Sequence, residues 1–136
     1  MASVLQDPAR STWNGRWPLV LIIDAEESVR DLYGDWFSSM GFQVMSAVGI
    51  LGLSMALRRE RPALIVTELR ARDLTLADLF ARLRAEDSTR CIPVVVLTSC
   101  CDEAALAEAR SLGAVAVLPK LAPFDALLSW VNALCR

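Results

Sequence analysis

The chain has 136 residues, a length that suits one domain with its own hydrophobic core. Its 14 Lys and Arg residues nearly balance 16 Asp and Glu residues, giving a net charge of -2. No basic surface therefore predicts direct binding to nucleic acid or to an anionic membrane. The apolar runs are shorter than the roughly 18 residues of a membrane span, and no signal peptide opens the chain. We expect a cytoplasmic protein.

The chain has four cysteines but no histidine to complete a common zinc-binding set. None of Cys91, Cys100, Cys101 and Cys135 has CxxC spacing, so we predict no metal site. Without a secretory signal the thiols are expected to be reduced. The adjacent Cys100 and Cys101 follow a predicted strand, which leaves a small thiol redox module as one alternative for the function.

Residues 1–17 show no sustained hydrophobic period and are predicted to form an N-terminal arm, which leaves 18–136 as the domain. From there, aliphatic runs typical of buried strands alternate with segments of helical periodicity. The predicted strands are 19–24, 42–47, 63–68, 94–99 and 114–118. The predicted helices are 27–40, 50–60, 74–85, 102–111 and 123–134.

Local signals support these boundaries. Acidic residues open the first and fourth helices, and Gly41 and Gly113 stop them. The first helix has an apolar stripe made of Val29, Leu32, Tyr33, Trp36 and Met40. The last helix has an inner face made of Phe124, Leu127, Leu128, Val131 and Leu134.

Five strands alternating with five helices predict an α/β domain with a parallel, doubly wound sheet, because right-handed crossovers place helices on both faces. Ligands of such sheets bind at the carboxyl ends of the strands. Three of the predicted strands end in polar residues there, namely Asp24, Glu68 and the pair Thr98-Ser99. We expect these residues to converge on one pocket.

The order of these residues resembles the receiver domain of two-component response regulators, over residues 18–136. The resemblance rests on Ile22-Ile23-Asp24, on a strand after Pro62 that ends in Glu68, on Leu97-Thr98-Ser99, and on Leu118-Pro119-Lys120 following Gly113. It implies one flavodoxin-like (βα)5 domain with strand order 2-1-3-4-5.

In the family that the chain resembles, two adjacent acids hold magnesium, and an aspartate at the end of the third strand accepts phosphate. A hydroxyl after the fourth strand and a lysine after the fifth contact that phosphate. These groups suit phosphoryl transfer, which needs a hard cation, an in-line nucleophile and a fixed positive charge. The resemblance puts Asp24 in the place of the first acid, Thr98 in that of the hydroxyl and Lys120 in that of the lysine.

The sequence departs from the family at four positions. Ala25 stands where the second acid belongs, and its methyl group cannot ligate magnesium. Glu68 replaces the phosphoacceptor aspartate and is one methylene longer. Val117 replaces the aromatic residue three positions before the lysine, and Leu121 replaces the proline after the lysine. We therefore expect no cofactor and weak or absent magnesium binding.

The favoured interpretation is a pseudo-receiver, which has no catalytic residue and acts in signal transduction by phosphorylation-independent protein–protein contact. Its remnant pocket holds one conformation, with the Glu68 carboxylate reaching Lys120 or Thr98. The main alternative is a receiver that is still phosphorylated and uses Glu26 or Glu27 as a substitute metal ligand. Ordinary roles also stay open, with Asp24 as a helix cap and Glu68 in a plain ion pair.

Trp130 marks a predicted interaction surface. It precedes the inward-facing Val131 by one residue, so helix geometry turns it away from the apolar stripe. An exposed tryptophan beside apolar residues is a frequent anchor of interfaces. Receivers commonly bind partners or a second copy through their fourth and fifth helices and last strand. We expect a protein partner or a homodimer there, and the sequence does not name the partner.

Overall fold

Three aliphatic strands form the centre of the sheet: β1 (Leu19–Ile23), β3 (Leu64–Thr67) and β6 (Val94–Thr98). Every residue in them is buried, which explains why their sequences lack the alternation of a half-exposed strand. The computed structural model describes residues 18–120 and 124–134. The arm predicted for residues 1–17 lies outside the described residues.

Two further strands, β2 (Gln43–Ala47) and β7 (Ala116–Pro119), complete a parallel sheet in the order β2-β1-β3-β6-β7. Numbered as five main strands, this is the predicted 2-1-3-4-5 order, so the flavodoxin-like fold is confirmed. Ile23 pairs with Thr67, and Thr98 pairs with Pro119. The carboxyl ends of the strands therefore lie along one edge of the sheet.

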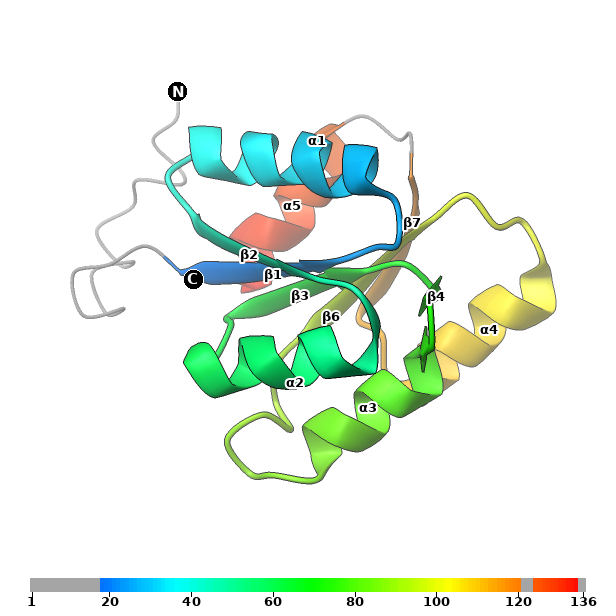
Figure 1. Cartoon of the computed structure of the whole chain (residues 1–136). Helices are drawn as coiled ribbons and strands as arrows, with labels where there is room; N and C mark the ends of the chain where they lie inside the picture. Colours follow the sequence, from blue (N-terminus) through cyan, green and yellow to red (C-terminus); the bar gives the residue numbers. More distant parts are fainter. Residues whose placement is uncertain (1–17, 121–123, 135–136) are drawn as a thin grey trace.

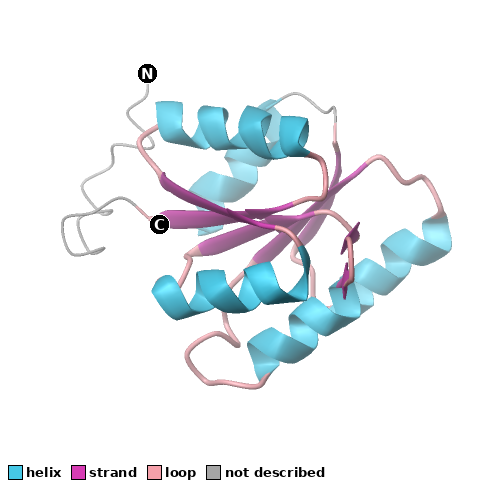
Figure 2. Ribbon diagram, viewed as in Figure 1, coloured by secondary structure: helices cyan, strands magenta, loops and turns pink. Residues whose placement is uncertain are grey.

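The helices form a layer on each face of the sheet. In Figures 1 and 2, α1 (Glu27–Ser39) and α5 (Phe124–Leu134) lie above it. Beneath it lie α2 (Gly49–Arg59), α3 (Leu76–Arg84) and α4 (Glu103–Leu112). Each layer has its own core of buried side chains against the sheet. The inner face predicted for the last helix is confirmed, since Leu127 and Val131 are buried there.

The apolar stripe predicted for α1 is wrong at one residue and misses another. Leu32 is 49% exposed, whereas Phe37 is completely buried beside Tyr33. Phe37 and Tyr33 are four residues apart and share one side of the helix, while Leu32 is turned by about 100° from Tyr33. Phe37 also meets Phe42 edge-on, with ring centroids 5.7 Å apart. Burial against the sheet therefore selects Phe37 as the anchor of α1.

A short hairpin before α3 was missing from the prediction. Residues 74–75, expected to begin the third helix, form β5 (Leu74–Thr75), which pairs antiparallel with β4 (Arg70–Ala71). Thr75 then caps α3 by accepting a hydrogen bond from the Asp78 N–H, and Asp78 returns the contact in a capping box. The cap moves the helix start to Leu76. The remaining boundaries agree with the prediction to within two residues.

No helix within residues 18–120 and 124–134 has the length and apolar character needed to cross a bilayer. The longest helix in this described part of the chain, α1, has 13 residues.

We predict that Phe37→Ala lowers the free energy of unfolding by about 3–5 kcal/mol, because a fully buried ring leaves a cavity. Leu32→Ala, the matched change on the exposed side of α1, should alter it by less than about 0.5 kcal/mol. Urea denaturation of both variants checks this. Equal losses would contradict the placement of the two side chains.

Candidate functional site

The site forms at the carboxyl edge of the sheet, where backbone hydrogen bonds extend the strand pairing. The Glu68 N–H donates to the Ile23 carbonyl over 3.0 Å, which brings Glu68 beside Asp24. The Lys120 N–H donates to the Thr98 carbonyl, also over 3.0 Å. Residues that are far apart in the sequence are thus brought together by the strand register. The predicted convergence of these polar residues is present.

Lys120 is the centre of the site. Its Nζ lies 2.9 Å from Asp24 Oδ2 and 2.9 Å from Glu68 Oε2. Glu26 Oε1 lies 3.4 Å from the same nitrogen. The side chains of Lys120, Glu68 and Asp24 are only 11%, 16% and 5% exposed, whereas that of Glu26 is 66% exposed. One ammonium therefore bridges two enclosed carboxylates, with a third at the solvent edge.

These contacts shift the ionisation of the lysine. Burial alone would lower the pKa of Lys120, because it removes water from the ammonium. Hydrogen bonds and charge interactions with Glu68 and Asp24 outweigh burial and raise the pKa above the ordinary value of 10.5. Lys120 is therefore cationic at any physiological pH.

Both carboxylates are held by further bonds. Asp24 Oδ1 accepts a hydrogen bond of 2.9 Å from the Glu26 N–H, at the start of α1. Glu68 Oε1 accepts one of 2.6 Å from the Leu69 N–H. Of the two ordinary roles left open by the sequence, the ion pair of Glu68 is present with Lys120, whereas Asp24 bonds the N–H of Glu26, the residue at the N-cap of α1, without capping the helix itself. In each carboxylate, one oxygen accepts a hydrogen bond from a backbone N–H and the other pairs with the Lys120 ammonium.

Two α1 side chains contribute contacts that the sequence analysis did not assign. Arg30 Nη1 donates to the Asp24 carbonyl over 2.8 Å. The Tyr33 hydroxyl donates to the Lys120 carbonyl. Burial raises the pKa of the Tyr33 phenol, Lys120 opposes part of this rise, and Asp24 adds to it. Arg30 and Tyr33 are three residues apart on α1 and follow Glu26 by four and seven positions, so this spacing was the signal that could have identified them.

Thr98 takes a local role. Its Oγ1 accepts a hydrogen bond of 3.1 Å from the Cys100 N–H, which orders the loop after β6. Of the two contacts expected for the Glu68 carboxylate, the structure forms the one with Lys120. Of the two substitute acids considered, it brings Glu26 to the site. Leu121 lies outside the described residues.

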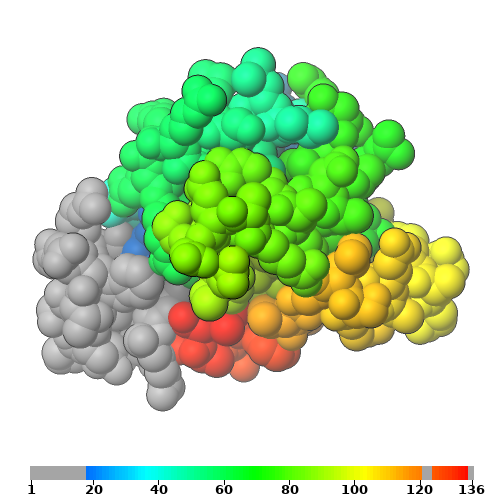
Figure 3. Space-filling view, turned by 90° about the horizontal axis from the view of Figure 1, so that it is seen from below, coloured from blue at the N-terminus to red at the C-terminus, as the bar shows by residue number. Residues whose placement is uncertain are grey.

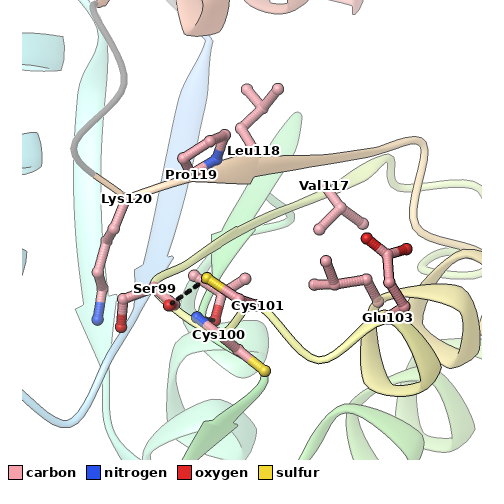
Figure 4. Close-up of a pocket in the computed structure, with 10 residues that line it drawn as sticks. Ser99, Cys100, Cys101, Glu103, Val117, Leu118, Pro119 and Lys120 are labelled. Carbon is pink, nitrogen blue, oxygen red and sulfur yellow. Dashed lines mark hydrogen bonds between the residues drawn. The ribbon is translucent and has the colours of Figure 1, made fainter.

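A pocket of about 410 Å³ opens beside Lys120, between β7, the β6–α4 loop and the start of α4. In Figure 4 the side chain of Val117 lies across this space from Cys100 and Cys101. The Cys101 thiol donates to the Ser99 carbonyl over 3.8 Å, and Cys100 Sγ accepts from the Asp102 N–H over 3.4 Å. The neighbouring thiols are free and have separate backbone partners.

Trp130, the predicted interface residue, belongs to α5. It is 36% exposed, while its neighbour Val131 is completely buried. The predicted outward direction of the tryptophan is therefore present.

A flavodoxin-like sheet with acids after its first and third strands and a lysine after its last defines the receiver class. Residues 20–132 match the family described as response regulator receiver domain. The match covers most of the chain, so the protein belongs to this family and is a receiver domain of two-component signalling.

Two curated proteins illustrate the relationship. The chain is 31% identical over 125 residues to the transcriptional regulatory protein GltR of Pseudomonas aeruginosa, covering 90% of this chain and 50% of GltR. It is 26% identical over 106 residues to sporulation initiation phosphotransferase F of Bacillus subtilis, covering 78% of this chain and 82% of that protein. The chain therefore spans half the length of GltR.

Solved structures agree. A response regulator receiver protein from Pseudomonas putida matches with a TM-score of 0.77 and 25% identity, covering 86% of this chain and 97% of the other. The chemotaxis protein CheY4 of Vibrio cholerae matches with a TM-score of 0.78 over 87% of this chain and 98% of its own. Because its identity is only 19%, this second likeness shows the fold alone.

We predict that Lys120→Met lowers the free energy of unfolding at pH 7 by about 3–5 kcal/mol, because it leaves two enclosed carboxylates unpaired. Arg90→Met is the matched control, since Arg90 pairs with Asp87 at 3.1 Å where both side chains are exposed. That loss should stay below about 1 kcal/mol.

The pH dependence follows from the raised pKa of Lys120. Stability gained by the charged lysine is fully present below the ordinary lysine value of 10.5 and is lost as pH rises through the higher folded value. The difference in the free energy of unfolding between wild type and Lys120→Met should therefore be constant from pH 7 to about 10 and become smaller above that pH. Urea unfolding across this pH range measures the difference. A difference that disappears near neutral pH would contradict the proposed ion pairing of Lys120.

Proposed function

We propose that this receiver acts as a pseudo-receiver, which transmits a signal through protein–protein contact without a cycle of aspartate phosphorylation. One observation carries the proposal: the Lys120 ammonium lies 2.9 Å from both Asp24 and Glu68. In this arrangement the protein's own cation neutralises the two carboxylates that remain of the acidic pocket.

The residues present do not fit the magnesium ion of the family. Magnesium prefers near-octahedral oxygen ligands and gives up its bound water only reluctantly. Ala25 offers no side-chain oxygen, and the nearest oxygens of Asp24 and Glu68 are occupied by Lys120. Within residues 18–120 and 124–134, no cluster of three or more acidic or thiol side chains is arranged to hold a metal. A divalent ion would have to displace the lysine.

The position of Glu68 also opposes phosphoryl transfer. Its extra methylene displaces the nucleophilic oxygen by about one bond length relative to aspartate, and in-line attack tolerates less than that. Both carboxylate oxygens are engaged, Oε1 by the Leu69 N–H and Oε2 by Lys120. The carboxylate is therefore held for a structural contact.

The same bonds favour a single signalling state. The extended Glu68 carries its charge to Lys120, as the phosphoryl group of a phosphoaspartate would, with fewer acceptor oxygens. Thr98 is bound to the Cys100 N–H, and the 410 Å³ pocket lies where Val117 replaces the ring of the family. No charge change at this site is then needed for partner binding.

A second candidate function has one observation in its favour. Glu26 Oε1 lies 3.4 Å from Lys120 Nζ and its side chain is 66% exposed, so it is free to turn towards an incoming cation. A receiver that recruits Glu26 in place of the missing acid would keep the phosphorylation cycle. The experiment below separates the two functions.

We predict no phosphorylation of the wild-type chain by acetyl phosphate with magnesium, measured as intact mass. Glu68→Asp alone should remain poorly labelled, because Ala25 still leaves the metal site incomplete. Glu68→Asp combined with Ala25→Asp should regain labelling, since it restores both the nucleophile and the second acid.

Stoichiometric addition of a phosphoryl group to the wild type would refute the pseudo-receiver. If Glu26→Gln then removed that labelling, the second candidate would replace it. Glu27→Gln is the matched control, because it changes the neighbouring acid, for which the structure gives no contact with Lys120.

The proposed signal leaves through the face made by α4, β7 and α5, where Trp130 is 36% exposed. Its partner is a protein of the signalling pathway or a second copy of this chain. We predict that Trp130→Ala weakens that association at least fivefold while leaving the thermal unfolding midpoint almost unchanged, since interface anchors commonly contribute more than about 1 kcal/mol. Sedimentation measures the association of two copies, titration calorimetry measures the binding of a partner, and thermal denaturation measures the unfolding midpoint. Unchanged association with an intact fold would remove Trp130 from the interface.

A further inference from the structure

The outer face of α2 is unusually apolar for a solvent-facing helix. Six large apolar side chains are exposed among the described residues, and three of them belong to this helix. Ile50 is 45% exposed, Leu51 72% and Met55 56%. Leu53 and Ala56, on the side of α2 opposite Leu51 and Met55, are buried against the sheet. The exposed three are therefore not needed for the core.

This apolar face continues into exposed arginines. Leu51, Met55, Arg58 and Arg59 have the spacing i, i+4, i+7 and i+8, which aligns them along one side of a helix. Arg58 and Arg59 are exposed, and the salt bridges within the described residues use other side chains. One end of the apolar face thus presents two available guanidinium groups.

The other end of α2 also lies beside arginines. Asp73 Oδ1 accepts a hydrogen bond of 2.9 Å from the Ile50 N–H, which joins the β4–β5 hairpin to the first turn of the helix. Arg70 and Arg72, both exposed, precede Asp73 in that hairpin. Figure 3 shows the surface of α2, in blue-green, beside the green surface that follows it in the chain. Arg58, Arg59, Arg70 and Arg72 outnumber the nearby acids Glu60 and Asp73, so the charge around the face is positive although the whole chain carries -2.

We propose that this α2 face, defined as Ile50, Leu51 and Met55 with Arg58 and Arg59, docks an acidic amphipathic helix of a protein partner. Apolar residues at helical spacing would cover Leu51 and Met55, and flanking Asp or Glu side chains would pair with the arginines. Charge complementarity selects this occupant. A second copy packed antiparallel would bring Arg58 and Arg59 towards the Arg70 and Arg72 end of its partner, and like charges would repel.

The docking face is separate from the Lys120 site and from Trp130. α2 lies on the face of the sheet opposite α5 (Figure 1), and the ion pairs of Lys120 are with Asp24, Glu26 and Glu68, all outside α2. The inference therefore does not depend on the proposed function, and either can fail while the other stands.

The test is a titration of the ¹⁵N-labelled full chain with a synthetic helical peptide that has leucines at i, i+3, i+4 and i+7 between glutamates. We expect saturable shifts at the amides of Ile50, Leu51 and Met55. Leu51→Ser with Met55→Ser should weaken binding at least about tenfold, as should Arg58→Glu with Arg59→Glu. Binding should also weaken with added salt.

Leu32→Ser is the matched control, because Leu32 is 49% exposed on α1 and its loss should leave the affinity unchanged. A peptide with lysine at every glutamate should not bind. The proposal is overturned by any of four results: no saturable binding, shifts centred on another face, equal binding of the lysine peptide, or serine variants with wild-type affinity. Binding of phosphatidylglycerol vesicles through this face without peptide binding, or self-association that the serine pair abolishes, would equally overturn it.

Discussion

A nearly enclosed lysine ammonium needs carboxylates at contact distance, and the cluster of Lys120 with Asp24 and Glu68 is the interaction on which the site depends. The three residues follow β7, β1 and β3, so they meet only because the parallel sheet aligns its carboxyl ends. The helix start at Glu26 and the Tyr33 hydroxyl then fix Asp24 and the Lys120 backbone from the side of α1. The strand register, the position of α1 and the charge pairing thus all hold the same three residues in place.

The departures from the family act together at this cluster. In the proposed pseudo-receiver, Ala25 supplies no magnesium ligand, and Asp24 pairs with Lys120 instead. Glu68 is long enough to place one oxygen on Lys120 and the other on the Leu69 N–H. In the proposed pseudo-receiver these changes replace an exchangeable metal and phosphate by permanent side-chain contacts. The regulated step then moves from chemistry at the pocket to the binding of partners at the surface.

The sequence predicted the parts of the fold that follow from local pattern. Continuous aliphatic runs located β1, β3 and β6, and the polar residues after them located the site. The prediction failed where tertiary contacts decide. Phe37, and not Leu32, is buried against the sheet. The pairing of residues 70–71 with 74–75 makes α3 begin two residues later than predicted. Tyr33 was expected in the core alone, because no one-dimensional pattern shows that its hydroxyl meets the Lys120 backbone.

The most direct measurement is a double-mutant cycle on the free energy of unfolding with Glu68→Gln, Lys120→Met and their combination. If the two side chains hold the pocket as described, the combined loss should be smaller than the sum of the single losses by about 1–3 kcal/mol, the range for residues in direct contact. Additive losses, within about 0.3 kcal/mol, would mean that Glu68 and Lys120 do not interact in solution and would contradict the account.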